Sequence, residues 1–287
     1  MYATVPPTPR TDTFLRALEA ARAPKQLARV RKTLACFESF QFDAGALDAA
    51  AVAAHVHARW DDTVALADHD DDRVRHAAVW ALGLSGDARA VDPLLRVLTH
   101  QRDHYDHDLG YMAFERLGAV ALPGLRGHAL QGEGEWHAQA VYSLGYLHAA
   151  RREAVAALED VVRARGQSPA VQLALFNLHA VEGIGLAVAG LADEPSRFEA
   201  VGTVHECLRV ARESGALASV DVAAVGRALA ALFDDARMGT VPEDPWASMF
   251  AWGIEALAWV QHPRAREVAL RVVADDTEPS ARLAALL

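Results

Sequence analysis

The chain has few of the features that mark secreted, membrane-spanning or disulfide-bonded proteins. Only two cysteines, Cys36 and Cys207, occur in 287 residues, and they lie far apart in the sequence. This scarcity argues against a disulfide framework and favours a reducing compartment. No stretch approaches the ~18 apolar residues that a membrane-spanning helix needs, and residues 1–10 lack the apolar core of a signal peptide. A cytoplasmic location without a membrane partner is therefore expected.

The motifs of common catalytic sites are also missing. The chain has no G-x-S-x-G nucleophile elbow and no phosphate-binding P-loop, and neither cysteine lies in a recognisable nucleophile motif. The glycine-rich stretch 183–190 differs from a dinucleotide-binding loop, because its third glycine is misplaced and a helical pattern, not a strand, precedes it. These absences favour a protein that is not an enzyme, with no catalytic residue and no cofactor.

Lysine is scarce, and the chain is acidic. Two lysines stand beside 26 arginines, and the formal net charge is −10. Because affinity for nucleic acid comes mostly from neutralised phosphates, this balance disfavours nucleic-acid binding. Residues 10–32 are an exception, with seven basic and two acidic residues. This local excess is typical of a solvated helix face, and docking on an acidic surface is the alternative.

Alanine and leucine dominate at helical spacing, and strand patterns are nearly absent. The best-defined unit spans residues 71–98 and predicts two helices joined by a turn at Ser85-Gly86-Asp87. The apolar stripe of its first helix follows i, i+3, i+4, i+7 and i+8: Val74, Ala77, Ala78, Ala81 and Leu82. Asp71 and Asp72 are expected to cap the start of this helix. Gly83 is expected to end it in a left-handed conformation.

Further units repeat this pattern along the chain. The second helix of the best unit carries Ala90, Val91, Leu94, Leu95 and Leu98, and partial copies follow at residues 105–130, 135–165, 169–191 and 246–274. Ser168 and Pro169 have the residue types of a helix N-cap and first helical position. Such units bury their apolar faces only by stacking. The sequence therefore predicts an all-α solenoid of stacked antiparallel helix pairs over residues 11–287, irregular to about residue 60, after a flexible tail at residues 1–10.

The unit at 71–98 resembles the bacterial HEAT-like repeats of the type named after phycobilisome lyases. The residues that carry the resemblance are Val74, Arg75, Ala78, Leu82, Gly83, Ala90, Val91, Pro93, Leu94, Leu95 and Leu98. The resemblance implies a HEAT-like superhelix in which the first helices lie on the convex side and the second helices line a concave groove. It leaves function open, because such proteins include scaffolds, chaperone-like adaptors, bilin lyases, a DNA glycosylase and a di-iron hydroxylase.

The outward residues of the second helices are the predicted contact surface for a partner. In the unit at 71–98 these are Arg89, Asp92 and Arg96, which are spaced to share one helix face. Glu159 and Arg163 are the corresponding candidates later in the chain. The preferred function is a non-enzymatic scaffold or adaptor that binds a protein or peptide along the concave face. A second copy of the chain, in a homo-oligomer, is another partner to consider.

Two clusters of histidine and aspartate, residues 69–73 and 100–108, have the residue types of a metal site. When the repeats are aligned, Asp71 falls on Asp106, so both clusters occupy the same loop, where aspartate is favoured as a helix cap. The sequence therefore predicts caps and no metal site. His205-Glu206 is a lone pair that cannot supply a di-iron centre, and His205 is expected to be an ordinary, partly buried histidine.

Two other functions stay open at this point. A HEAT-type enzyme, or a lyase or chaperone subunit, would hold a metal or a tetrapyrrole ligand. An acidic inhibitor would bind a basic partner, and the charge of −15 outside residues 10–32 favours it. A HEAT-type glycosylase is disfavoured because it needs a basic groove with exposed aromatic residues. The tryptophans are instead expected mostly in the core, with Trp136 and Trp252 on inward positions.

Overall fold

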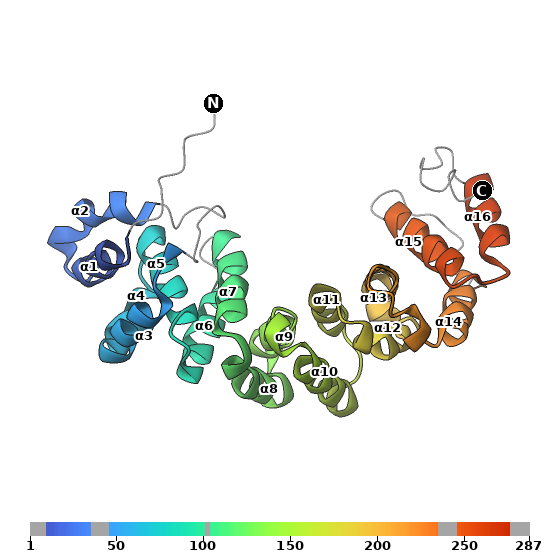
Figure 1. Ribbon diagram of the computed structural model, residues 1–287, viewed down its shortest axis with the longest axis horizontal. Helices are drawn as coiled ribbons and strands as arrows, with labels where there is room; N and C mark the ends of the chain where they lie inside the picture. Colours follow the sequence, from blue (N-terminus) through green and yellow to red (C-terminus); the bar gives the residue numbers. More distant parts are fainter. Residues whose placement is uncertain (1–9, 36–45, 101–103, 235–245, 276–287) are drawn as a thin grey trace. The chain divides into compact units, whose positions relative to one another are not determined.

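The computed structural model describes residues 10–35, 46–100, 104–234 and 246–275 (Figure 1). Within these ranges all regular structure is helical, and no strand occurs. The predicted tail at residues 1–10 lies, except for Arg10, outside the described residues. The chain divides into two compact units, residues 1–150 and 151–287, which are described separately below.

The first unit consists of helix pairs packed on their neighbours. Its helices are α1 (Thr11–Ala21), α2 (Pro24–Leu34), α3 (Ala49–Ala58), α4 (Trp60–Leu66), α5 (Asp72–Gly83), α6 (Val91–His100), α7 (His104–Leu117), α8 (Leu122–Gln131) and α9 (Gly134–Leu144). The first helices α5 and α7 pack on each other, and the second helices α6 and α8 also touch. Helix α6 packs in addition on α7 and α9, so the two rows of helices enclose the core between them (Figure 1).

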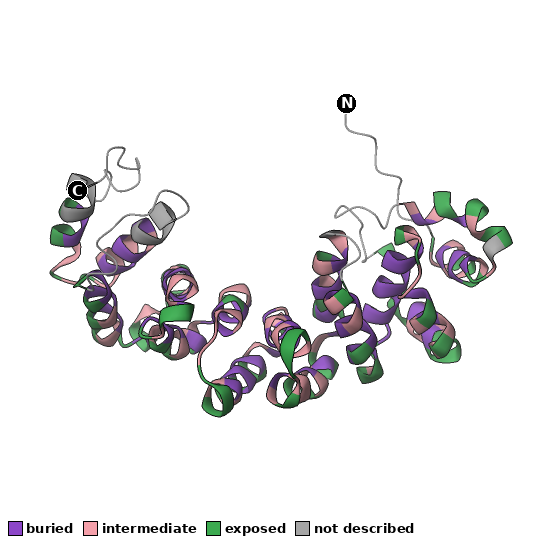
Figure 2. Cartoon of the chain, turned by 180° about the vertical axis from the view of Figure 1, so that it is seen from behind, coloured by how far each residue is buried: buried purple, intermediate pink, exposed green. Residues whose placement is uncertain are grey.

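The second unit repeats this arrangement. Its helices are α10 (Arg151–Arg165), α11 (Pro169–Leu178), α12 (Ile184–Gly190), α13 (Arg197–Glu213), α14 (Val222–Asp234), α15 (Trp246–Trp259) and α16 (Ala265–Asp275). Helix α13 packs on both α11 and α15, while α12 lies against α13 and α14 against α15. Buried residues face inward between the helices and exposed ones face out (Figure 2). Stacked neighbouring pairs in both units confirm the predicted all-α solenoid.

Helix α5 is the most deeply buried element of the first unit. Its predicted apolar stripe is confirmed, since Val74, Ala77, Ala78, Ala81 and Leu82 are all 0% exposed. The remaining residues from Val74 to Gly83 are buried as well, including Arg75 and Trp80. The physical reason is that α5 is surrounded, with contacts to α1, α2, α3, α4 and α7. Although the sequence of α5 has an amphipathic pattern, the helix is central and is buried from Val74 to Gly83.

Helix ends follow local signals in one case and tertiary contacts in another. The predicted cap at Ser168 is confirmed, because its Oγ accepts a hydrogen bond from the Val171 N–H at 3.4 Å and Pro169 opens α11. The prediction of a left-handed Gly83 is wrong. A Cβ on Gly83 would lie 2.8 Å from Ala113 Cα, so this glycine lets α5 approach the backbone of α7. Gly118, at the aligned position, does have the left-handed φ of +67°.

Gly83→Ala is therefore expected to destabilise the protein by about 1–3 kcal/mol, because overpacking forces α5 and α7 apart. Gly127→Ala is the matched control, since Gly127 lies inside α8 with nothing within 4 Å of an added Cβ. The control should be neutral or stabilising by up to about 1 kcal/mol, from higher helix propensity. Urea denaturation of both variants measures the difference. Equal midpoints for the two variants would refute the close-approach explanation.

Candidate protein-interaction surfaces

Arg89, Asp92 and Arg96, here called the second-helix surface, lie on α6 and in the short turn before it. Arg89 belongs to the 3-10 turn Ala88–Ala90, and its side chain is 60% exposed. Its guanidinium donates to both carboxylate oxygens of Asp87, at 2.6 Å to Oδ2, and lies 4.3 Å from the ring centre of Trp60. The hydrogen bond from Arg89 holds the pKa of Asp87 below its usual value. Arg89 is thus an exposed cation held on an aromatic ring.

The other two residues of the second-helix surface contact polar side chains outside α6. Arg96 reaches Asp68, which precedes α5, with 3.3 Å between Nη1 and Oδ2. Asp92 Oδ1 lies 2.7 Å from Nε2 of His128 on α8. The side chains of Asp92 and Arg96 are 67% and 40% exposed, so the predicted outward orientation is observed. Exposed pairs of this kind contribute only about 0–1 kcal/mol each, and a partner's charges can replace them at little cost.

The later candidates belong to the second unit. Glu159 and Arg163 are exposed residues of α10. Arg163 Nη1 lies 2.5 Å from Oδ1 of Asp160, one turn earlier on the same helix. Glu159 and Arg163 are therefore a candidate surface of the second unit.

Asp106, from the second histidine and aspartate cluster, belongs to a buried network between α5 and α7. Arg75 Nε donates to Asp106 Oδ1 at 2.7 Å, and His76 Nε2 lies 3.1 Å from the same oxygen. All three side chains are at most 2% exposed. Burial acts to raise the pKa of Asp106, but hydrogen bonds from His76 and Arg75 and the charge of Arg75 outweigh it and lower that pKa. The network therefore connects the first helices of two neighbouring repeats through buried hydrogen bonds.

The predicted cap at Asp71 is wrong. Its side chain caps no backbone N–H; instead it accepts from Arg31 Nε of α2 at 2.6 Å. Asp71 and Asp106, which occupy equivalent repeat positions, therefore each bind an arginine of an earlier first-unit helix. Among the residues that the structure describes, no three histidine, cysteine or carboxylate side chains are grouped as a metal site requires. Residues 101–103 of the second cluster lie outside that set.

An unpredicted group of aromatic side chains lies on α7, on α9 and in the turn that follows α9. Tyr111, Tyr142 and Tyr146 form what we call the tyrosine cluster. The rings of Tyr111 and Tyr146 are stacked, with centres 4.7 Å apart and planes 7° from parallel. Tyr142 meets the other two edge to face, at 4.7 and 5.7 Å. Tyr111 is buried, at 1% exposure, while Tyr142 and Tyr146 are half-buried. Two aromatic side chains are thus partly open to solvent above a third that supports them.

Hydrogen bonds fix the orientation of this cluster. Gln139 Nε2 donates to the Glu135 carboxylate at 2.6 Å, so its Oε1 is the acceptor for the Tyr111 hydroxyl at 2.5 Å. A hydroxyl has one proton to donate. His107 Nε2, 2.9 Å from the same hydroxyl, must therefore be the donor there. The chain of hydrogen bonds runs from His107 through Tyr111 and Gln139 to Glu135. It fixes the orientation of the buried Tyr111, on which the outer rings pack.

Two carboxylates contact hydrogen-bond partners of the tyrosine cluster: Glu135 accepts from Gln139, and Asp108 Oδ1 lies 3.6 Å from Nδ1 of His107. Burial raises the pKa of Tyr111 above its usual value, and the neighbouring tyrosines, Glu135 and Asp108 raise it further. Burial, Tyr142, Asp108 and Glu115 do the same to the pKa of Tyr146. The three carboxylates belong to exposed residues. A negative field over half-exposed aromatic rings favours a cation as the ligand.

The second unit has its own aromatic group, built around His205 on α13. The imidazole lies between Trp252 and Trp259 of α15, with ring centres 5.9 and 4.6 Å away, and its Nε2 is 3.1 Å from Oε2 of Glu255. His205, expected to be partly buried, is buried, at 7% exposure. Glu206 pairs with His179 and Arg209 instead, so His205-Glu206 is not a working pair. Arg212 lies 4.7 Å from the ring centre of Trp259.

The sequence of residues 45–124 matches the family of HEAT repeats. This segment is HEAT-like. It runs from just before α3 into the first turn of α8 and includes Arg89, Asp92 and Arg96. No curated protein matches the chain at a significant level. Across the described ranges, no helix combines the length and apolar character needed to cross a membrane.

The tyrosine cluster begins inside the HEAT-like segment and continues beyond it, and sequence reasoning missed it. The available signal was the i, i+4 spacing of His107 with Tyr111, which places that pair on one side of α7. Tyr142 and Tyr146 have the same spacing, but Tyr146 follows the end of α9. Nothing in that spacing shows that the two pairs meet. The half-buried Trp136 and Trp252, expected on inward positions, are likewise less enclosed than predicted.

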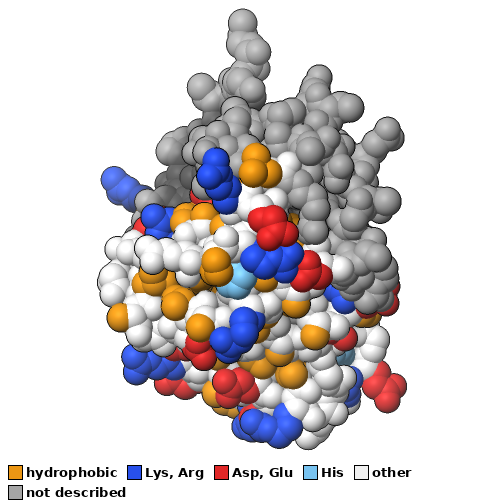
Figure 3. All heavy atoms as spheres, turned by 90° about the vertical axis from the view of Figure 1, so that its right-hand side faces the viewer, with side chains coloured by type: hydrophobic (Ala, Val, Ile, Leu, Met, Phe, Trp, Pro, Cys, Tyr) orange, Lys and Arg blue, Asp and Glu red, His pale blue; other side chains and the backbone are white. Residues whose placement is uncertain are grey.

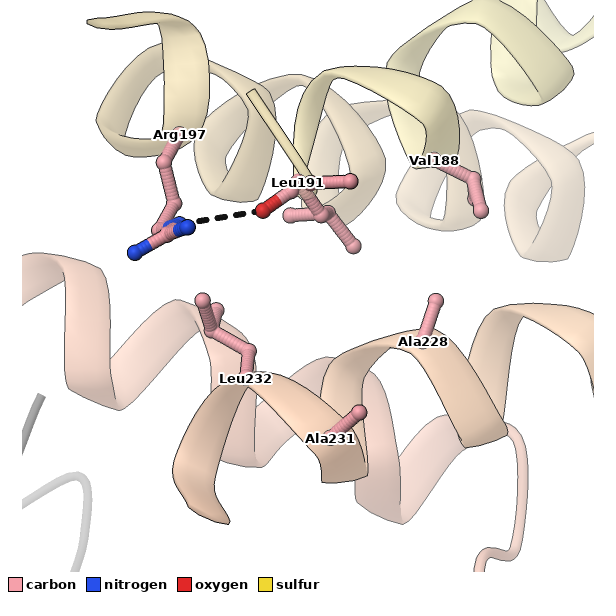
Figure 4. A pocket seen from close by; sticks show the side chains of 7 residues that line it. Val188, Leu191, Arg197, Ala228, Ala231 and Leu232 are labelled. Carbon is pink, nitrogen blue, oxygen red and sulfur yellow. Dashed lines mark hydrogen bonds between the residues drawn. The ribbon is translucent and has the colours of Figure 1, made fainter. Parts of the chain in front are cut away.

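A pocket of about 260 Å³ lies between α12 and α14 of the second unit (Figure 4). Small apolar side chains line most of it, and the one charged lining residue, Arg197, donates from Nε to the Leu191 carbonyl at 3.0 Å. A substrate site normally offers several converging polar groups, which this pocket does not. On the face shown in Figure 3, basic, acidic and apolar side chains are interspersed without a patch of one sign.

Proposed function

We propose that the chain is a non-enzymatic scaffold or adaptor that binds a protein or peptide partner. The observation that carries the proposal is the HEAT-repeat match over the segment that holds Arg89, Asp92 and Arg96. Stacked helical repeats offer extended surfaces for binding rather than enclosed cavities. The proposed contacts are the second-helix surface in the first unit and Glu159 with Arg163 in the second.

The chemistry of the second-helix surface supports this role. Arg89 combines a cation with the aromatic ring of Trp60, and arginine and tryptophan are enriched among residues that dominate binding energy. The pairs of Arg96 with Asp68 and of Asp92 with His128 are exposed. Their charges are therefore available for exchange with charges of a partner, which gives specificity and a faster encounter.

Several finer features belong to the same proposal. We propose a cytoplasmic protein with no metal, cofactor or nucleic-acid partner, from its two cysteines and its acidic balance. Assignment of the repeats to the bacterial, phycobilisome-lyase type rests on the resemblance of residues 71–98. So does a single solenoid domain over residues 11–287. An acidic inhibitor of a basic partner is a second candidate, which the net charge of −10 favours.

Affinity capture with a triple variant tests the scaffold proposal. Arg89→Ala/Asp92→Ala/Arg96→Ala is expected to lower recovery of the proteins captured by the unchanged chain about tenfold or more, since loss of key contacts costs more than 1 kcal/mol. Glu159→Ala/Arg163→Ala tests the second unit in the same way. Quantitative mass spectrometry of the captured proteins provides the measurement.

Asp12→Ala/Arg16→Ala is the matched control. It removes an exposed i, i+4 ion pair from α1, where the side chains are 67% and 72% exposed, and should leave capture unchanged. If the triple variant recovers the same proteins in the same yield as this control, the second-helix surface is not the contact surface.

A further inference from the structure

We propose that the tyrosine cluster of the first unit binds an arginine side chain from a basic segment of a protein partner. This inference rests on the protein-binding function proposed above and adds a second contact, on α7, α9 and the turn after α9 rather than on α6. The occupant follows from the chemistry of the site. A guanidinium stacks on aromatic rings and also bonds carboxylates, and the site offers both kinds of group.

The aromatic part of the site is preorganised. Tyr142 and Tyr146 are half-buried, and the stacked ring of Tyr111 supports Tyr146 from within, at 4.7 Å between centres. The hydrogen bonds from His107 through Tyr111 to Gln139 hold the Tyr111 ring in one orientation. A rigid receptor loses less conformational entropy on binding than a flexible one. The solvent-exposed parts of the Tyr142 and Tyr146 rings are therefore held in position to stack with a planar cation.

The charged part of the site consists of three carboxylates on exposed residues: Asp108 and Glu115 of α7 and Glu135 of α9. Asp108 Oδ1 lies 3.6 Å from Nδ1 of His107, Glu135 accepts from Gln139, and the charge of Glu115 contributes to the raised pKa of Tyr146. Three carboxylates near one aromatic surface attract a cation and repel an anion. Among the described residues, no arginine is stacked on Tyr142 or Tyr146.

The same chain shows the expected binding mode elsewhere. Arg89 lies 4.3 Å from the ring centre of Trp60 while pairing with the Asp87 carboxylate. Arg212 lies 4.7 Å from the ring centre of Trp259. In the tyrosine cluster the aromatic rings and the carboxylates come from this chain. The arginine is the component that a partner would supply.

Fluorine NMR of the full chain labelled with 3-fluorotyrosine tests the proposal. The chain has five tyrosines, so each resonance is assigned from one Tyr→Phe variant. The probe is a glycine–serine peptide with two arginines, and the matched peptide carries citrulline, which is neutral and of similar shape. The arginine peptide should shift the resonances of Tyr142 and Tyr146 in a saturable way. The citrulline peptide should bind about tenfold more weakly or less, as expected for loss of a cation–π contact and its ion pair.

Variants separate this site from general attraction to an acidic protein. Tyr146→Leu and Asp108→Asn/Glu115→Gln should each weaken the arginine peptide about tenfold, while the conservative Tyr146→Phe should keep its affinity. Glu153→Gln/Glu213→Gln removes the same charge from exposed positions of the second unit and should have no effect. Circular dichroism shows whether each variant is folded.

Three results would overturn the proposal. They are equal binding of the citrulline peptide, equal binding of a lysine peptide, and a loss in Glu153→Gln/Glu213→Gln as large as in Asp108→Asn/Glu115→Gln. The Arg89→Ala/Asp92→Ala/Arg96→Ala variant should bind the arginine peptide with unchanged affinity. Failure of the scaffold proposal therefore shows in partner capture, and failure of the arginine site shows in the peptide titration.

Discussion

Asp106→Ala is expected to destabilise the first unit by about 3–5 kcal/mol, because it leaves a buried cation without its main counter-charge. Arg75 is 2% exposed, and its Nε donates to Asp106 at 2.7 Å. The contacts of Arg75 with Asp72 and the His69 carbonyl persist but do not replace the lost carboxylate within α7. Urea denaturation monitored by circular dichroism measures the change in the free energy of unfolding.

A double variant and a surface pair are the controls for this result. Arg75→Met/Asp106→Leu removes both charges and should be clearly more stable than Asp106→Ala, since well-packed apolar residues often replace a buried pair without loss. Asp160→Ala/Arg163→Ala breaks a largely exposed pair and should cost at most about 1 kcal/mol. If Asp106→Ala costs no more than this surface variant, the network does not hold the repeats together.

The same interaction predicts a dependence on pH. The folded pKa of Asp106 is lowered, so its contribution to stability is fully present above its usual pKa and is lost as pH falls through the lower folded value. The stability difference between the unchanged chain and Asp106→Ala should therefore narrow below about pH 4, near the usual aspartate pKa. If the stability difference instead widens as the pH falls, the pKa of Asp106 is raised in the folded state and not lowered.

Leu82→Ala is expected to cost about 2–5 kcal/mol, whereas Arg96→Ala should change stability by no more than about 0.5 kcal/mol. Leu82 is 0% exposed in the centre of the first unit, so its removal leaves a cavity that the surrounding helices cannot close completely. The Arg96 side chain is 40% exposed, and its pair with Asp68 spans 3.3 Å. Denaturation curves of the two variants compare these values, and coincident midpoints would show that the helix faces are assigned wrongly.

Local patterns correctly predicted the apolar stripe of α5 and the start of α11, whereas no predicted repeat unit covered α13 and α14. The stripe from Val74 to Leu82 depends on spacing within one helix, and so does the cap at Ser168 before Pro169. Contacts between residues three or four apart are present wherever a helix forms, whatever it packs against. For the same reason the outward orientation of Asp92 and Arg96 was predictable before any tertiary contact was known.

Contacts between distant residues were beyond the reach of such patterns. Asp71 has the residue type of a helix cap, but Arg31, forty residues earlier, takes its carboxylate. Gly83 has the residue type of a left-handed helix end, but the backbone of Ala113 explains it. The tyrosine cluster brings together side chains of α7, α9 and the turn after α9.

The sequence by itself thus determined the helical repeats, their apolar faces and the acidic character of the chain, because these depend on composition and on spacing within a helix. Only the tertiary structure decided which polar residues form buried contacts between helices and which aromatic residues stay partly exposed to solvent. The reason is that stacking of the repeats brings together residues about thirty positions apart, such as Arg75 and Asp106. The hydrogen bonds and the charge state of each residue depend on the partner that stacking supplies.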